Sequence, residues 1–190
     1  VGVSNLTILH HPDGHLVYGL DLRRDIARVI RQFKPDVVIT ANFELQAYGG
    51  WNQSDHRVAG LVALDGLRDA DNTWIFRELA EDEGLPKWST TWFLIAGRPD
   101  ATHGIAVDQS DVDKAVASLE CHHAYLADLP NHPKPADFIP EILTKGGEAI
   151  GTDLATIHPM NRLVQGEVGS GKTVVALRAM LQVIDSGRQA

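Results

Sequence analysis

The sequence has a single cysteine, Cys121, so no disulfide can form within the chain. No apolar run approaches the about 20 residues that a membrane-spanning helix needs. The 190 residues carry a formal net charge of -8, which gives the chain as a whole no basic footprint for nucleic acid or anionic membranes. No basic segment followed by an apolar stretch opens the chain, so no secretory signal is indicated. We therefore expect a cytoplasmic protein with no membrane partner, and nucleic acid is not its expected ligand.

Both ends of the sequence have features that we expect of a cut chain. The first residue is Val1 rather than methionine, and the last residues, "LRAMLQVIDSGRQA", are typical of a helix and its stop with nothing after it. We expect both ends to be cut. The length suits one well-buried domain, or one domain with a fragment of another. The content of 44% hydrophobic and 22% charged residues is ordinary for a globular chain.

The first forty residues predict a strand, a turn, a helix and a second strand, which together make a right-handed βαβ unit. The strand is the apolar "LTIL" at residues 6–9, and the second strand is Asp36–Thr40. The helix between them has apolar residues at helical spacing, namely Leu22, Ile26, Val29, Ile30 and Phe33. The loop at residues 41–54 then follows the carboxyl end of a strand, where open α/β sheets place their ligands.

The rest of the chain continues the α/β pattern. The further predicted elements are a helix from Asp55 capped by Ser54 or Asp55, a strand at Trp88–Gly97, a helix from Ser110, and a Pro-rich irregular segment at residues 131–143. The composition shifts near Gly146–Thr152. Beyond that point "RLVQ", a Gly-rich turn and "TVVALRAML" predict a strand, a loop and a helix.

The stretch "HHPDGH" at residues 10–15 allows two interpretations. Imidazole and carboxylate at the end of a strand suit a zinc or iron site, with His10, His11 and Asp13 as the available ligands. Pro-Asp-Gly is also strong turn chemistry, in which proline presets φ and Gly14 takes a positive φ. On the segment alone, the turn is the favoured interpretation, because Pro-Asp-Gly is such strong turn chemistry.

Residues 166–173, "GEVGSGKT", are a full match to the phosphate-binding loop pattern. Glycines let backbone N–H groups curl around an anion, a lysine neutralises the outer phosphates, and a threonine hydroxyl reaches magnesium. The predicted helix that follows would direct its N-terminus at the phosphate. A chance Gly/Ser turn is the alternative, and the full pattern in this context argues against it. The predicted nucleotide-binding residues are Gly166, Gly169, Gly171, Lys172 and Thr173.

The tail "DLATIHPMNRLVQGEVGSGKTVVALRAMLQVIDSG" resembles the first nucleotide-binding motif of RecG-type branched-DNA helicases, in which "PMxRLLQGDVGSGKT" opens the motor domain. The resemblance covers about Asp153–Ala190, a fifth of the chain. It implies that the loop binds ATP with magnesium. It does not carry over DNA unwinding, because the other helicase motifs are absent from this sequence.

The string "NQSDHRVAG" at residues 52–60 places an Asp-His pair at the start of a helix, after the long loop. His56 could bind a metal while Asp55 steers a proton or orients the ligand. Alternatively, Asp55 only caps the helix and His56 is an exposed residue of its first turn.

The order of these segments resembles the later two thirds of the PIG-L/LmbE-like deacetylases, over about Val1–Thr152. These are zinc amidases that remove acetyl groups from N-acetylglucosamine-type substrates, and the resemblance implies a Rossmann-like, three-layer parallel sheet. The family's "HPDHRAAG" motif implies zinc at His56 and a catalytic Asp55, with Gln53 in place of a histidine that assists the carbonyl. An amide N–H of Gln53 could still donate to an oxyanion. "SLECHHAYL" resembles a family helix that implies a secondary catalytic candidate, His122.

The family's other metal motif, "AHPDDE", is not present in this sequence. Since catalytic zinc normally has three protein ligands, His56 alone makes no stable site, and we expect inefficient deacetylation. The sequence therefore predicts a partial PIG-L/LmbE-like deacetylase at residues 1–152, truncated at the N-terminus, joined to a RecG-like strand, loop and helix at residues 153–190. An acetylated sugar is its expected substrate, the oligomeric state is open, and the alternatives are an ATP-binding fragment or a nonfunctional fusion remnant.

Overall fold

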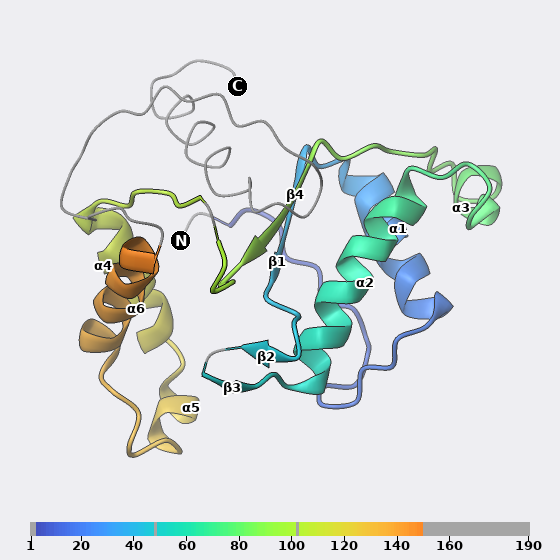
Figure 1. The fold of residues 1–190 in the computed structure, drawn as a ribbon. Helices are drawn as coiled ribbons and strands as arrows, with labels where there is room; N and C mark the ends of the chain where they lie inside the picture. Colours follow the sequence, from blue (N-terminus) through green and yellow to red (C-terminus); the bar gives the residue numbers. More distant parts are fainter. Residues whose placement is uncertain (1–2, 48, 102, 150–190) are drawn as a thin grey trace. The chain divides into compact units, whose positions relative to one another are not determined.

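The computed structural model describes residues 3–149 apart from residues 48 and 102. The described residues form two compact units, one of residues 7–98 and the other of residues 3–6 and 99–149 (Figure 1). The predicted phosphate-binding loop and its flanking strand and helix lie outside the described residues. Among the helices that are described, none is long and apolar enough to cross a membrane.

A parallel pair of strands organises the unit of residues 7–98. Strand β1 (Val37–Ala41) pairs with β4 (Trp92–Ala96) from Val37 opposite Trp92 to Ala41 opposite Ala96. Both strands are rich in β-branched and aromatic residues, which fit a pleated, half-buried surface. Parallel strands need a crossover connection, and helix α2 (Ser54–Ala70) with α3 (Arg77–Glu81) provides it here. The unit is therefore a mixed α/β structure with a parallel sheet.

Helices α1 (Leu20–Phe33) and α2 lie against each other (Figure 1). Their contact is close at Gly66, where an added Cβ would lie 2.6 Å from Cγ2 of Ile26. Helix α1 ends at Lys34, which has a left-handed φ of 55° directly before Pro35. The structure confirms the predicted helix and its end. The buried apolar core beside this contact consists of Ala27, Ile30, Leu67, Ala70 and Leu79.

Arg31 is a buried charged residue of α1 that binds the chain beyond α2. Its side chain is 1% exposed, and its guanidinium group donates to five main-chain carbonyls, those of Asp69, Ala70, Asn72, Ile75 and Phe76. The last carbonyls of a helix have no intrahelical partner, and a basic group there satisfies them. Burial lowers the pKa of Arg31 from its ordinary value, yet a guanidinium stays charged at neutral pH.

The strand predicted at residues 6–9 is not formed. Leu6 and Ile8 are 81% and 72% exposed, and no residue from 3 to 18 is in a strand. A strand requires a ladder partner, and within the described part of the chain β1 pairs only with β4. The parallel unit is consequently β1, α2 and β4, rather than the predicted strand, helix and strand of the first forty residues. The predicted strand at Trp88–Gly97 is correct but shorter, as β4.

The other unit contains α4 (Gln109–Glu120), α5 (His123–Ala127) and α6 (Pro135–Ala149), with α4 packed against α6. Asp108 caps α4 in a capping box with Asp111, so the helix begins at Gln109, one residue before the predicted start at Ser110. The prediction of an irregular segment at residues 131–143 is wrong, because α6 begins within it. Pro135 occupies the first helical position, where a missing N–H removes no helical bond.

Candidate functional site

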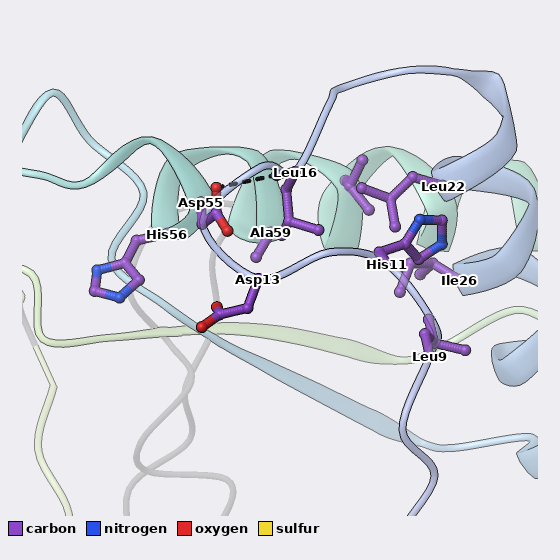
Figure 2. Close-up of a pocket in the computed structure, with 10 residues that line it drawn as sticks. Leu9, His11, Asp13, Leu16, Leu22, Ile26, Asp55, His56 and Ala59 are labelled. Carbon is purple, nitrogen blue, oxygen red and sulfur yellow. Dashed lines mark hydrogen bonds between the residues drawn. The ribbon is translucent and has the colours of Figure 1, made fainter. Parts of the chain in front are cut away.

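A cavity of about 410 Å³ lies in the unit of residues 7–98, between the loop before α1 and the first turns of α2. Its volume is within the range of small-molecule sites, which are mostly apolar with a few polar groups. Figure 2 shows its walls, with Asp13, Asp55 and His56 toward one end and Leu9, Leu22 and Ile26 toward the other. The complete lining is Leu9, His11, Asp13, Leu16, Leu22, Ile26, Asp55, His56, Ala59 and Val62.

One wall of the cavity is the segment of residues 9–16, which we call the strap. Its turn is the predicted Pro-Asp-Gly turn, in which the His15 N–H lies 3.3 Å from the carbonyl oxygen of Pro12 and Gly14 has a φ of 77°. The turn interpretation of this stretch is therefore confirmed. A glycine is required at this position, because residues with a side chain rarely adopt such a φ.

The strap is attached at both ends to different helices. At one end, Nε2 of His11 lies 2.9 Å from Oδ2 of Asp25 on α1. At the other end, the backbone N–H of Leu16 donates to Oδ1 of Asp55 on α2 at 3.1 Å (Figure 2). The strap thus crosses from α1 to α2 and forms a wall of the cavity between them.

Just beyond the strap, the hydroxyl of Tyr18 donates to the carboxylate of Asp65, again on α2. That hydrogen bond, more than burial, raises the pKa of Tyr18 above its ordinary value, since the neutral phenol is the donor. A third attachment therefore fixes the chain that enters α1.

Asp55 is a buried carboxylate in the first turn of α2. Its side chain is 6% exposed, and Oδ2 has no hydrogen-bond partner among the described residues. Burying such an oxygen without a donor is costly, so this atom points to a ligand. The positive end of the helix dipole favours its charge. The capping prediction is wrong, because Gln53 occupies the N-cap position and neither Ser54 nor Asp55 caps the helix.

His56 is exposed on the first turn of α2 and is held by an asparagine network. Its Nδ1 lies 3.2 Å from Oδ1 of Asn52, whose Nδ2 donates to the carbonyls of Asn42 at 2.9 Å and Glu44 at 3.0 Å. Asn42 in turn donates to the carbonyl of Gly97 at 3.2 Å. Asn42 and Gly97 directly follow β1 and β4, so the network joins the carboxyl ends of both strands to the imidazole.

Sequence reasoning missed Asn42 and Asn52 as site residues. Both are buried side chains whose contacts join segments distant in the sequence. Their position directly after a buried strand and before the Asp-His pair is the one signal that could have found them. The loop between them also holds a small antiparallel hairpin, β2 (Gln46–Ala47) and β3 (Gly50–Trp51), which the sequence did not predict.

A close contact fixes the first turns of α2 against the loop after β1. A Cβ added at Gly60 would overlap the side chain of Phe43. Only glycine allows this approach, and it fixes how far the helix lies from the end of β1. The spacing between Asp55, His56 and the strand ends thus depends on Gly60.

A series of hydrogen-bonded charged side chains links His11 of the strap to Asp25 and Arg28 of α1 and then to Glu83. Asp25 accepts from Nη1 of Arg28 at 2.6 Å, and Arg28 also donates to both carboxylate oxygens of Glu83, at 2.8 and 3.0 Å. The arginine hydrogen bond holds the pKa of Glu83 below its ordinary value. This arrangement orients Asp25, and Asp25 orients His11.

The other predicted site residues lie as follows. Gln53 is exposed beside the cavity-lining Asp55 but does not itself line the cavity. His122 lies in the other unit, where its Nδ1 is 3.1 Å from the carbonyl oxygen of Ser118, and it does not line the cavity either. The structure therefore brings together Asp55 and His56, and it adds Asp13 and His11 from the strap. The predicted nucleotide-binding residues, Gly166 to Thr173, lie outside the described residues.

Within residues 3–149 as described, no group of three or more His, Cys, Asp and Glu side chains is arranged to hold a metal ion. His56 with the carboxylates of the cavity therefore forms no such group, and neither do His10, His11 and Asp13 of the strap. The residues present do not fit the predicted zinc site.

Comparison with known proteins gives two separate likenesses. The family model described as PIG-L, GlcNAc-PI de-N-acetylase, matches residues 1–66, which include every residue that lines the cavity. The crystal structure of the conserved protein TT1542 from Thermus thermophilus aligns with a TM-score of 0.55 and 18% identity, over 75% of this chain and 59% of that one. It supports the α/β fold alone.

The second likeness is to ATP-dependent DNA helicase RecG. The Mycobacterium leprae protein is 53% identical over 55 residues, which are 27% of this chain and 7% of the helicase. The Pasteurella multocida protein is 46% identical over 65 residues, 34% of this chain and 8% of the helicase. The chain therefore spans less than a tenth of these relatives and somewhat more than half of the Thermus protein.

Proposed function

We propose that the unit of residues 7–98 is the substrate-binding part of a hydrolase that removes acetyl groups from N-acetylglucosamine-type amides. One observation carries the proposal: the buried, unpartnered Oδ2 of Asp55 faces a cavity whose whole lining falls inside the segment that is similar to GlcNAc-PI de-N-acetylases. The likeness to the Thermus protein concerns the fold alone, for which we propose a Rossmann-like, three-layer arrangement.

The side chains of this site have complementary roles in the proposal. Oδ2 of Asp55 accepts a hydrogen bond from an N–H or O–H of the substrate, because it has no other donor in the described structure. The imidazole of His56 lies on the same helical turn, where Asn52 orients it for proton transfer. The side-chain amide of Gln53 can donate an N–H to the oxyanion that forms when the acetyl carbonyl is attacked.

The family resemblance implies a catalytic zinc ion, but the described residues do not form a zinc-binding site. Catalytic zinc normally takes three protein ligands, of which this part of the chain offers His56. We therefore derive no catalytic step through a metal. A metal at His56 would need further ligands from outside the described residues, and inefficient hydrolysis by this chain alone is part of the proposal.

The test measures acetate release from N-acetylglucosamine, with and without added zinc. The expected result is slow hydrolysis that falls at least tenfold in both Asp55→Asn and His56→Ala. His123→Ala is the matched control, since it removes an exposed histidine of the other unit. Acetate release that is equal in all four proteins would contradict the proposed site, and the absence of release from the unsubstituted chain would contradict the activity.

A second candidate function is nucleotide binding, favoured by the RecG similarity and the full phosphate-loop pattern. The longer RecG match spans 34% of the chain, more than the fifth predicted from Asp153, so we propose that the RecG-like segment begins before residue 153. Calorimetry with ATP and magnesium should give a heat of binding that Lys172→Ala abolishes and that Lys114→Ala, on the exposed side of α4, retains. No heat from either ATP or the deacetylase substrate would favour a nonfunctional remnant.

A further inference from the structure

We propose that the cavity beneath the strap binds the aliphatic part of an N-acylated ligand, so that acyl chains longer than acetyl are preferred. The inference rests on the proposed function and deepens it, by naming the class of substrate. It follows from the size of the cavity, from the division between its two ends, and from the hydrogen bonds that keep it open.

The volume is much larger than an acetyl group requires. A dry apolar cavity of about 150 Å³ is enough to hold benzene, which has six carbons. The cavity here is about 410 Å³ and opens to solvent, and a single methyl group would leave most of its apolar wall uncovered. A chain of roughly four to eight carbons is the matching aliphatic ligand.

The cavity lining has a polar end and an apolar end, which match the polar amide and the apolar chain of an acyl amide. Six residues of the wall are apolar, namely Leu9, Leu16, Leu22, Ile26, Ala59 and Val62. In Figure 2 the apolar side chains of Leu9, Leu22 and Ile26 lie at the end away from Asp55 and His56. His11 is at the apolar end, and its Nε2 is already engaged by Asp25. An acyl chain would therefore meet apolar surface while its amide lies near the carboxylates.

The polar end selects the head group. Oδ1 of Asp55 is occupied by the N–H of Leu16, whereas Oδ2 is buried without a donor. A neutral amide N–H or a sugar hydroxyl satisfies this oxygen. The carboxylate of a free fatty acid would instead face Asp55 and Asp13, two like charges in a partly apolar site. The site should thus distinguish acyl amides from fatty acids of equal length.

The strap explains why the cavity does not collapse. It is attached to α1 through His11 and to α2 through Leu16, so its wall cannot move inward without the loss of a hydrogen bond. A preformed cavity costs its ligand little reorganisation. The binding affinity should therefore rise with each methylene group that is added to the acyl chain.

Calorimetry tests the inference with N-acylglucosamines whose acyl groups have two, four, six and eight carbons, and with octanoate as the fatty acid. The affinity should rise about fourfold per added methylene, the factor expected when one CH₂ leaves water. Octanoate should bind at least tenfold more weakly than N-octanoylglucosamine. A flat series, or octanoate binding as well as the amide, would overturn the inference.

Ala59→Phe fills the cavity from the exposed side of α2, and Leu61→Phe adds the same ring to an exposed residue of that helix outside the cavity. The chain-length gain should disappear in Ala59→Phe and persist in Leu61→Phe, with far-UV circular dichroism unchanged in both. If the Ala59→Phe variant does not fold, Leu9→Asn on the strap is the alternative variant. The chain-length gain should disappear in it as well. An undiminished gain in the folded variant contradicts the inference.

The two proposals fail in different ways. A chain-length series without any acetate release supports the cavity and contradicts the hydrolase. Acetate release with a flat series supports the hydrolase and contradicts the acyl preference.

Discussion

Replacing Arg31 by methionine tests the argument that one buried guanidinium group stabilises the turn from α2 to α3. Methionine keeps much of the apolar stem but removes every donor, and the structure gives those donors five carbonyl acceptors. Arg31 is 1% exposed, so water does not easily replace it at the carbonyls of Asp69 and Ala70. A buried acceptor that loses its donor costs about 1 to 3 kcal/mol.

Each buried carbonyl that loses its donor is assigned a cost of about 1 kcal/mol, for three or more of the five carbonyls, because water can replace the guanidinium group at the less buried ones. The free energy of unfolding should then fall by about 3 to 5 kcal/mol. Urea unfolding followed by tryptophan fluorescence measures this change, and Trp88 is a suitable reporter because its indole N–H donates to the carbonyl of Pro35 at 2.8 Å.

Arg77→Met is the matched control for this experiment. Arg77 is exposed and pairs with Glu81 one helical turn away, so its loss should cost less than about 1 kcal/mol. If Arg31→Met costs less than about 1 kcal/mol, the carbonyls find other donors, and the guanidinium group is not what holds this turn.

Three further predictions concern residues that support the site without lining the cavity. Gly60→Ala should destabilise the protein by about 1 to 3 kcal/mol in the same urea assay, because the new Cβ overlaps Phe43. Asn52→Ala should cost about 1 to 3 kcal/mol, because two carbonyls lose their donor. Asp65→Asn should let Tyr18 ionise at lower pH, seen as tyrosinate absorbance at about 295 nm. With its raised pKa, Tyr18 contributes stability that is complete below the ordinary value of 10.0 and lost as pH rises through the raised value.

Two of these predictions have a control variant in the same unit, and the third has an outcome that would refute it. Gly50→Ala meets no atom within 4 Å, so it should leave stability almost unchanged, and an equal loss at both glycines would refute the packing argument. Asn72→Ala removes an exposed cap of the Trp74 N–H and should cost less than Asn52→Ala. An identical tyrosine titration after Asp65→Asn would mean that the phenol does not depend on that carboxylate.

The local parts of this fold could be predicted from the sequence, and the nonlocal parts could not. The apolar spacing of α1, its stop at Lys34, and the Pro-Asp-Gly turn depend on neighbouring residues alone, and all three are observed. The strand at residues 6–9 has strand-like residues, but a strand also needs a partner, which residues 6–9 cannot specify. The helix at Pro135–Ala149 was missed because its prolines were taken as breakers, whereas Pro135 occupies the first helical position and Pro140 is accommodated inside the helix.

The candidate site shows the same division. The sequence pointed to Asp55 and His56 through their place at a helix start, and both line the cavity. Their supports, Asn42 and Asn52, belong to a hydrogen-bond network between the two strand ends and α2, and the sequence marks these two residues only by their place between a buried strand and the Asp-His pair. Only the capping alternative for Asp55 is wrong, because its carboxylate accepts from the backbone of Leu16 across the fold and Gln53 occupies the N-cap position.

The glycine contact between the two long helices has a consequence for ligand selection. Gly66 touches Ile26, and Ile26 is itself part of the cavity wall on α1. The strap is anchored on both helices, so its span must match the distance between them. A side chain at position 66 would push the helices apart and stretch that span. The width of the cavity between α1 and α2 therefore depends on Gly66, a residue that does not line it. Substitutions at this position would change which acyl chain lengths fit, although every lining side chain would remain the same.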